Sequence, residues 1–520
     1  MKLIKTIFLA CSLCVSIVAM GQNIDVQRYI FDLELKENSD AITGKATIIV
    51  KFLKPTTEVV FDLASIVEDK GMQAFSVMHD NRMLQFNHRN NKLTIYLTQP
   101  SQAGNAASFE VNYMGVPRDG LIISQNQYGE RTFFADNWPD RAHQWIPCVD
   151  RPDDKAAVEF YITAPAGYKV ISNGEQVTDP KSLTSKWHYR EELPLPTKVM
   201  VIGAARFAVS RVDSSFHVPV YSWVYKQDSA KGSYDYALAE DIIRFFESYV
   251  APFPYRKLAN VQSKTIFGGM ENAGAIFYAE NTVTGDRKSE SLIAHEVAHQ
   301  WFGNTATEKS FTHLWLSEGF ATYLTDIYLE NKYGVDSFKK RLMNERAEVL
   351  EFARVSKQAV VDSTSAYMDL LNPNSYQKGG WILHMLRGEV GDSVFQRIIQ
   401  TYYQQYRHAN ADTRDFETVA EKVANVDLTW FFEQWLYRPG VPKLDFAVSK
   451  QKDKTLVTIS QKQSMPYRLT LYLEYKSHDG SYQVQTKSIS NSQEQIELPA
   501  SITDLRVDAS KLLYDGKIKL

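Results

Sequence analysis

Alternating apolar and polar residues dominate the chain from Ile24 to about Phe207. Short runs rich in β-branched and aromatic residues occur at 46–53, 57–64, 92–99, 108–115 and 158–165. Such runs, with period two and turn residues between them, are typical of β-strands that bury one face. The pattern predicts an N-terminal antiparallel β domain, to which we assign residues 22–208.

From about residue 209 the spacing of apolar residues changes to three and four. It continues for more than three turns in each of the stretches 236–250, 291–303, 314–334, 378–406 and 413–424. This spacing places the apolar residues on one face of a helix. The sequence therefore predicts a mainly helical central domain over 209–441, which ends where Pro439, Gly440 and Pro442 break the pattern.

Alternation returns in the last part of the chain, at 446–460, 467–489 and 502–508. Asp479 and Gly480 separate two strand-like runs, and this dipeptide is a strong signal for a β-hairpin. We expect a small C-terminal β-sandwich over 442–520. The fold class predicted for the whole chain is α+β, with several domains.

The first 21 residues have the pattern of a secretory signal. Lys2 and Lys5 precede an apolar run from Ile7 to Val18, and small residues follow up to Gly21. We therefore expect export, to the periplasm or the exterior, with cleavage near Gly21. A retained anchor is the alternative, and a lipid attached at Cys11 is a weaker one. No later stretch approaches the ~20 apolar residues of a membrane span.

Charge and cysteine content narrow the range of functions. The 520 residues include 58 Lys and Arg against 61 Asp and Glu, so the formal net charge is -3 and no basic excess indicates a nucleic acid partner. No obligate protein partner is evident. Without residues 1–21 only Cys148 remains, which excludes an internal disulfide and is typical of a small buried residue.

The stretch HEVAHQWFGN, from His295 to Asn304, has the spacing of a metal site. On a helix, His295 and His299 share one face and can bind the same ion, while Glu296 lies near enough to act as a base. Glu318 on the next amphipathic stretch supplies the third ligand that a catalytic zinc requires. Three polar residues passing by on a helix are the alternative, and a structural zinc site would normally need more cysteines.

Together with FGGMENAG upstream, this ligand pattern resembles the zinc aminopeptidases typified by aminopeptidase N and leukotriene hydrolase. The segments IPCVDRPDDKA, YQKGGWILHML and DLTWFFEQWL occur in the order of that family. The resemblance covers nearly the whole chain after the signal. It implies a thermolysin-like catalytic domain, one Zn²⁺ per chain and peptides with a free N-terminus as substrates.

The resemblance also implies roles for individual residues. Glu271 would bind the α-amine of the substrate, through a charge-assisted hydrogen bond that fixes the scissile bond one residue from the end. Tyr376 would donate its hydroxyl to the oxyanion, with Tyr367 as its rival, and Glu296 would transfer the proton of the attacking water. The remaining residues of the substrate-binding motif are Gly268, Gly269, Met270 and Asn272, of which Met270 would line the pocket for the first side chain.

Three features depart from the family pattern. Where the family has a glutamine that helps to hold the amine, this chain has Asp136 or Asn137. His313 and Ser317 stand where an aspartate and an asparagine are usual, and we expect His313 to be a polar contact rather than a ligand. The large helical C-terminal domain of many relatives is not predicted here, so we expect a more open cleft.

Two other enzymatic functions are compatible with the same residues. A zinc endopeptidase would cleave peptides with a blocked N-terminus, and an epoxide hydrolase would need a deep lipid-shaped cavity that no sequence pattern indicates. A non-enzymatic binding module would be expected to lack a ligand or the base, and neither is lacking here. The sequence therefore favours a zinc-dependent aminopeptidase.

Overall fold

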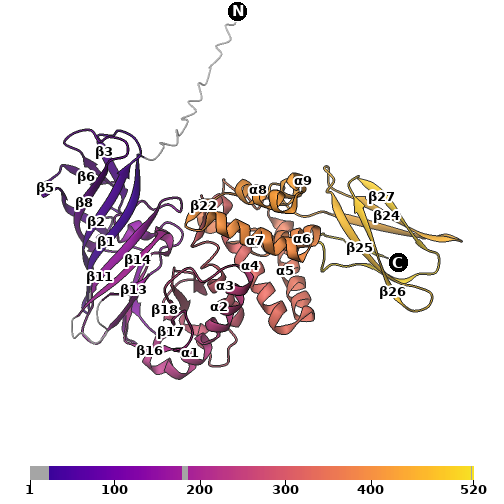
Figure 1. Cartoon of the computed structure of the whole chain (residues 1–520), viewed down its shortest axis with the longest axis horizontal. Coiled ribbons are helices and arrows are strands. Elements are labelled where there is room, and N and C mark those ends of the chain that lie inside the picture. The colour runs from indigo at the N-terminus through magenta and orange to yellow at the C-terminus, as the bar shows by residue number, and fades with distance from the viewer. Residues whose placement is uncertain (1–22, 178–184, 517, 520) are drawn as a thin grey trace, which may run out of the picture.

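The computed structural model describes residues 23–177, 185–516, 518 and 519. Three regions follow one another along the chain (Figure 1): a strand-rich N-terminal region, a central region of helices around a small sheet, and a C-terminal region of strands. The expected secretory signal, residues 1–21, lies outside the described residues. Among those that are described, no helix combines the length and the apolar character needed to cross a membrane.

The N-terminal region is built from three sheets. The largest within the described residues has eight strands, in the order β13 (Glu175–Gln176), β14 (Lys186–Pro196), β11 (Lys155–Thr163), β1 (Ile24–Lys36), β2 (Ser39–Phe52), β8 (Ala106–Val116), β4 (Gly71–His79) and β5 (Arg82–Met83). The two smaller sheets have the orders β3 (Glu58–Asp62), β7 (Lys92–Tyr96), β6 (Phe86–Arg89) and β12 (Lys169–Ser172), β15 (Ile202–Ala205), β10 (Arg131–Ala135), β9 (Leu121–Gln125). Most neighbours pair antiparallel, as predicted, but β1 and β11 pair parallel.

The central region contains a five-stranded mixed sheet that the pattern of spacing did not predict. Its order is β16 (Phe207–Arg211), β17 (Val220–Tyr225), β18 (Leu258–Ser263), β20 (Ala275–Ala279) and β19 (Gly269–Met270). Parallel strands covered on both faces show no alternation, and every residue of β18 is buried. Phe207 and Ala208, assigned to the first domain by pattern, already belong to this sheet.

Helices make up the rest of the central region. They are α1 (Ser229–Tyr236), α2 (Leu238–Tyr249), α3 (Glu290–Ala298), α4 (Trp315–Tyr333), α5 (Val335–Val355), α6 (Gly379–Val390), α7 (Asp392–Tyr406), α8 (Thr413–Ala424) and α9 (Thr429–Leu436). The stretch 378–406, predicted to be helical, forms two helices because Gly391 lies between them at φ 83°. A short parallel pair, β21 (Ala306–Glu308) and β22 (Ala409–Ala411), links the two halves of the region.

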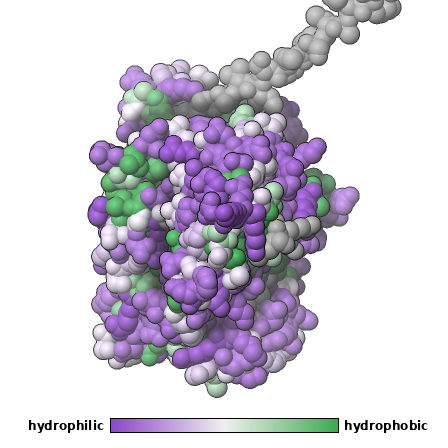
Figure 2. All heavy atoms as spheres, turned by 90° about the vertical axis from the view of Figure 1, so that its right-hand side faces the viewer, coloured by the Kyte–Doolittle hydropathy of each residue, from purple (hydrophilic) through white to green (hydrophobic). Residues whose placement is uncertain are grey.

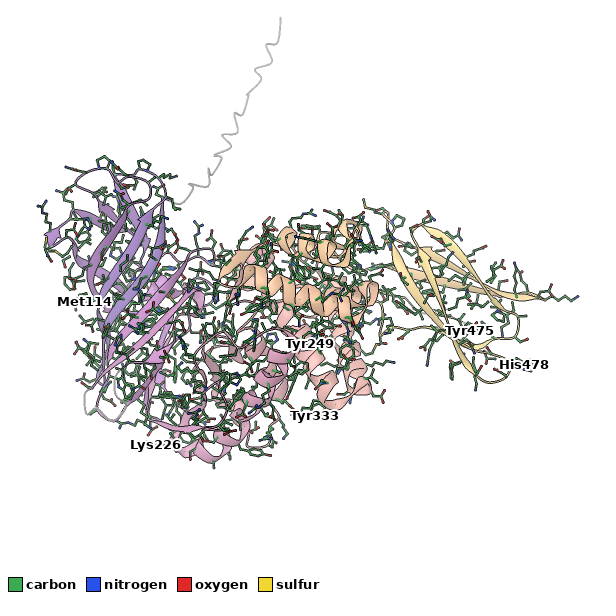
Figure 3. The ribbon with its side chains drawn as sticks, viewed as in Figure 1. Met114, Lys226, Tyr249, Tyr333, Tyr475 and His478 are labelled. Atoms are coloured by element: carbon green, nitrogen blue, oxygen red, sulfur yellow. The ribbon has the colours of Figure 1, made fainter. Side chains whose placement is uncertain are left out.

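The core of the central region surrounds α4. Its residues from Trp315 to Tyr328 are all buried, and Trp301 and Trp381 are fully buried as well. A helix that is buried on every side has no face toward solvent, so the carboxylates of Glu318 and Asp326 on α4 are shielded from water. Figure 3 shows side chains in all three regions, including Met114 on β8, Tyr249 and Tyr333 at the ends of α2 and α4, and His478 in the C-terminal hairpin.

The C-terminal region consists of two sheets. Their orders are β27 (Gln493–Pro499), β24 (Lys454–Gln461), β23 (Leu444–Lys450), β29 (Ile518–Lys519) and β26 (Tyr482–Ile489), β25 (Leu469–Lys476), β28 (Thr503–Val507). β25 and β26 pair antiparallel around Gly480 at φ 85°, so the predicted hairpin is confirmed. Figure 2, which views the molecule from this end, shows a mostly hydrophilic surface with scattered hydrophobic patches.

Candidate metal and peptidase site

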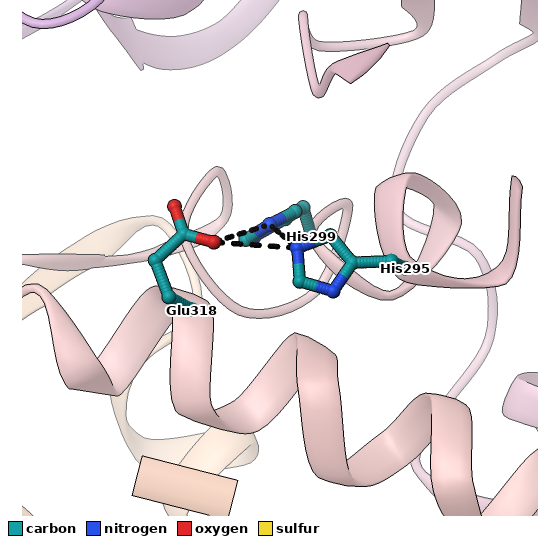
Figure 4. Close-up of side chains that lie close together, drawn as sticks. All are labelled: His295, His299 and Glu318. Atoms are coloured by element: carbon teal, nitrogen blue, oxygen red, sulfur yellow. Dashed lines mark hydrogen bonds and ion pairs between the residues drawn. The ribbon is translucent and has the colours of Figure 1, made fainter. Parts of the chain in front are cut away.

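The three predicted metal ligands converge between α3 and α4. His295 lies in the last turn of α3, His299 follows the helix, and Glu318 lies in the first turn of α4 (Figure 4). Both imidazole Nε2 atoms are 3.3 Å from Glu318 Oε2, and they are 3.1 Å from each other. Three ligand atoms of types suited to zinc therefore face one point, as the spacing predicts.

The surroundings hold each ligand in place. His299 Nδ1 lies 3.1 Å from Ser317 Oγ and 3.1 Å from the carbonyl oxygen of Phe302, which orients the imidazole so that Nε2 faces Glu318. Burial acts to raise the pKa of Glu318, but the charge of His299 and hydrogen bonds from both imidazoles lower it below its usual value. Glu318 is thus kept as a carboxylate, the form that binds a cation.

Two further carboxylates lie beside these ligands. Oxygens of Glu296 and Glu271 lie within 4.8 Å of each other and of a ring nitrogen of His299. Burial is the main cause that raises the pKa of both, and the pKa of Glu296 lies well above its usual value. A carboxylate with a raised pKa can take up a proton and release it again.

The motif that precedes Glu271 forms the edge of the central sheet. Gly269 and Met270 are β19, which pairs antiparallel with β20. Gly268, Gly269, Met270 and Glu271 line a cavity of about 650 Å³ with His295, Glu296, His299, Glu318 and Tyr376. Asn272 is fully buried behind this wall and does not line the cavity. The structure therefore brings most of the expected substrate-binding residues to one cavity.

Tyr376 enters the cavity from a π-helical turn, η7 (Asn374–Lys378), that precedes α6. Its ring stacks against that of His295, with centroids 5.9 Å apart. Single π-helical turns are frequent at functional sites, and this one is anchored at its end by Lys378, whose Nζ donates to the carbonyl oxygen of Gly440 at 2.8 Å. The rival Tyr367 packs on Phe311 with centroids 4.8 Å apart and does not line the cavity.

Comparison with known proteins adds independent evidence. The Peptidase M1 N-terminal domain matches residues 26–198, and the Peptidase family M1 domain matches residues 234–435, which include every residue of the site described above. The chain belongs to peptidase family M1. The site thus lies within the segment that defines this family.

Named proteins of the M1 family match over most of this chain. Aminopeptidase M1-C of Oryza sativa subsp. japonica is 25% identical over 438 residues, which are 79% of this chain and 49% of the rice protein. Leucyl aminopeptidase of Saccharolobus solfataricus is 27% identical over 70% of this chain and 47% of its own length. Aminopeptidase N of Lactococcus lactis subsp. lactis is 26% identical over 84% of this chain and 53% of its own length. The chain spans about half the length of these relatives.

The structure gives Asp136 partners that the M1 pattern did not suggest. Its carboxylate accepts hydrogen bonds from Arg141 at 2.8 Å, from the Thr265 hydroxyl at 3.1 Å and from the amide of Ile266 at 3.0 Å. The side chain is fully buried and does not line the cavity. Asn137 is engaged as well, by Trp145 and two backbone carbonyls. Asp136 thus holds the loop that leads into the substrate-binding motif.

Replacing Asp136 by asparagine tests this placement. We expect the free energy of unfolding to fall by about 2 kcal/mol, because a charge-assisted pair with Arg141 is lost, while KM for peptides with a free amine stays within about twofold. Urea unfolding and initial rates measure the two quantities. A raised KM with unchanged stability would instead favour direct contact between Asp136 and the amine.

Other residues of the M1 site were not singled out from the sequence. Gln300 and Asn304 donate to the carbonyl oxygen of Glu271 at 2.9 Å and 2.6 Å, so the segment that follows α3 fixes the position of the proposed substrate-binding motif. Gln300 lies four residues after Glu296, a spacing that could have indicated a shared face. Trp138 lines the cavity from the N-terminal region, and no local sequence signal indicates this.

Two residues that depart from the family pattern have clear positions. His313 Nδ1 lies 2.9 Å from the Thr413 hydroxyl, which is the expected polar contact between elements, and His313 does not line the cavity. Ser317 contacts His299, and Gly303 at φ 114° passes so close that a Cβ there would lie 2.3 Å from Ser317 Oγ. The small residue at each position lets the loop after α3 close over His299.

Proposed function

We propose that this protein is a zinc-dependent aminopeptidase that removes N-terminal residues from peptides. The observation that carries the proposal is the placement of Glu271 beside His299 and Glu296, in the cavity that the three metal ligands line. Membership of the M1 family supports it, and so do the names of the relatives, which are aminopeptidases. A thermolysin-like architecture of the central domain belongs to the same proposal.

The donor set fits one zinc ion. Two imidazole nitrogens and one carboxylate oxygen are a known catalytic zinc set that keeps a position open for water or substrate, and here the three ligand atoms lie 3.1 to 3.3 Å from one another. His295, His299 and Glu318 would hold the ion. When bound, zinc supplies a more acidic water and polarises the scissile carbonyl.

The protein's own residues account for the remaining steps. Glu271 binds the α-amine, and its buried Oε1 has no hydrogen-bond partner among the described residues, which leaves it available to an ammonium. Glu296 takes a proton from the attacking water and returns it to the leaving amine. Tyr376 donates its hydroxyl to the oxyanion, and burial raises the pKa of that hydroxyl, which keeps it protonated.

The deciding experiment uses one peptide with either a free or an acetylated N-terminus, each with and without a zinc chelator. We expect release of the first amino acid from the free form alone, and loss of this release with chelator. Restoration by added zinc is the control for damage by the chelator. Equal cleavage of both forms would overturn the role of Glu271 and make the protein an endopeptidase.

Export completes the proposal. The pattern of residues 1–21 supports a cleaved signal and a periplasmic or external location. Cys148 is a free and buried cysteine. Burial raises the pKa of its thiol well above the usual value, which keeps the thiol protonated. Mass spectrometry of the mature N-terminus checks the cleavage site near Gly21.

A further inference from the structure

A cationic side chain lines the active-site cavity away from Glu271. Arg341, on α5, lines the cavity next to Ser291 and Leu292 of α3. Ser291 precedes His295 by one turn of the helix, about 6 Å along its axis, whereas Glu271 lies beside His299 at the other end of the histidine pair. The cavity therefore has Glu271 at one end and Arg341 at the other.

The positions of Glu271 and Arg341 match the direction in which a bound peptide would lie under the proposed function. If Glu271 binds the α-amine and the scissile carbonyl lies at the histidines, the part of the peptide that leaves must extend away from Glu271. That direction runs along α3 toward Ser291 and Arg341. The side chain of Arg341 is 31% exposed, so it is accessible from the cavity that it lines.

The contacts of Arg341 fix the guanidinium and leave donors for a ligand. Nε donates to Asp326 and lies 3.2 Å from Glu345 Oε1, and Nη1 donates to the Ser291 hydroxyl at 2.8 Å. A guanidinium has five N–H donors, and no hydrogen bond from Nη2 occurs within the described part of the chain. Asp326 and Glu345 are buried, so they hold the group from behind.

The other charged side chains that line the cavity also differ in sign between its two ends. Glu271 and Glu296 lie beside His299, Glu318 lies between the two histidines, and Arg341 and the exposed Lys288 are the cationic side chains that line the cavity. Lys288 is exposed and pairs with Asp286 at 2.5 Å. Arg341 contacts Asp326, Glu345 and Ser291, so its position is better fixed than that of Lys288. A short peptide has the complementary distribution, an ammonium at one end and a carboxylate at the other.

We propose that Arg341 binds a carboxylate on the leaving part of the substrate, close to the scissile bond. The carboxylate is either the C-terminus of a short peptide or an acidic side chain. An arginine fork matches a carboxylate in geometry and charge. Arg341 thereby selects short or acidic peptides, and this inference rests on the proposed aminopeptidase function.

The test compares three substrates that share an N-terminal leucine. Leucyl-glycyl-glycine carries a terminal carboxylate, its C-terminal amide carries none, and leucyl-glutamyl-glycine amide carries only a side-chain carboxylate. We expect KM to be about tenfold lower for at least one of the carboxylate substrates than for the neutral amide. The substrate that shows the difference identifies the source of the carboxylate.

Replacing Arg341 by methionine should abolish this tenfold difference, measured within the variant as the ratio of KM for the neutral amide to KM for the carboxylate substrate. Arg346→Met is the matched control, since Arg346 lies on the same helix but donates to the carbonyl oxygen of Tyr514 and does not line the cavity. If the single variant fails to fold, Asp326→Asn combined with Arg341→Met removes the arginine together with one of the two buried carboxylates that contact it.

The outcomes separate the two proposals. Equal KM values for all three substrates in the unmodified protein, or a difference that persists in the Arg341 variants, would overturn the role of Arg341 while leaving the aminopeptidase in place. A protein that releases no leucine from any of the three substrates would instead contradict the proposed function itself.

Discussion

Replacing Glu296 by glutamine is expected to lower kcat by about 10³-fold, within the 10²- to 10⁴-fold range of general acid–base catalysis. Glutamine keeps the shape of the side chain but accepts no proton at neutral pH. Because Glu296 lies outside the predicted ligand set, the zinc content of the variant should equal that of the unmodified protein. Initial rates with a free-amine peptide and metal analysis together make the measurement.

A second buried glutamate provides the control for this variant. Glu191 is 3% exposed, burial raises its pKa, and it lies in β14, away from the cavity. Glu191→Gln should therefore retain kcat within about twofold. If Glu296→Gln kept more than a tenth of the activity, the proton would have to be carried by another group.

The second large effect is expected for Tyr376. Its replacement by phenylalanine removes one hydroxyl donor to the oxyanion and should lower kcat by about 10²- to 10³-fold, with KM nearly unchanged. We expect kcat to fall without a change in KM because this hydrogen bond forms only as the carbonyl oxygen becomes negative. The stacking of the ring on His295 does not involve the hydroxyl, so the site should keep its geometry.

Tyr367→Phe is the matched control, because Tyr367 was the alternative to Tyr376 in the sequence. Tyr367 is 47% exposed and does not line the cavity, so its variant should be fully active. Loss of kcat in the Tyr367 variant, with activity retained in the Tyr376 variant, would reverse the assignment.

The convergence of the three proposed ligands could be predicted in part from local geometry. His295 and His299 are one helical turn apart, so periodicity places them on one face, whereas the approach of Glu318 depends on the packing of α4 against α3. Tyr376 and Glu271 required a resemblance to known enzymes, because a tyrosine or a glutamate in a turn has no distinctive spacing.

Other parts of the site depend on tertiary packing, which periodicity does not report. Asp136 occupies the predicted region of the chain, but its carboxylate accepts hydrogen bonds from Arg141, the Thr265 hydroxyl and the Ile266 amide and does not line the cavity. Arg341 reaches the cavity from α5, a helix whose pattern shows only that one face is apolar. The central strands β17, β18 and β20 were missed because nearly all of their residues are buried, so they show no alternation.

The contact between α4 and the start of α6 has a further consequence. A Cβ at Gly319 would lie 2.9 Å from backbone atoms of Gly379, and a Cβ at Gly379 would lie equally close to Gly319. Gly319 adjoins Glu318, the proposed metal ligand, and Gly379 comes three residues after Tyr376, the proposed hydroxyl donor. The separation between Glu318 and Tyr376 therefore depends on glycine at both positions, and a larger residue at either one would push the two backbones apart.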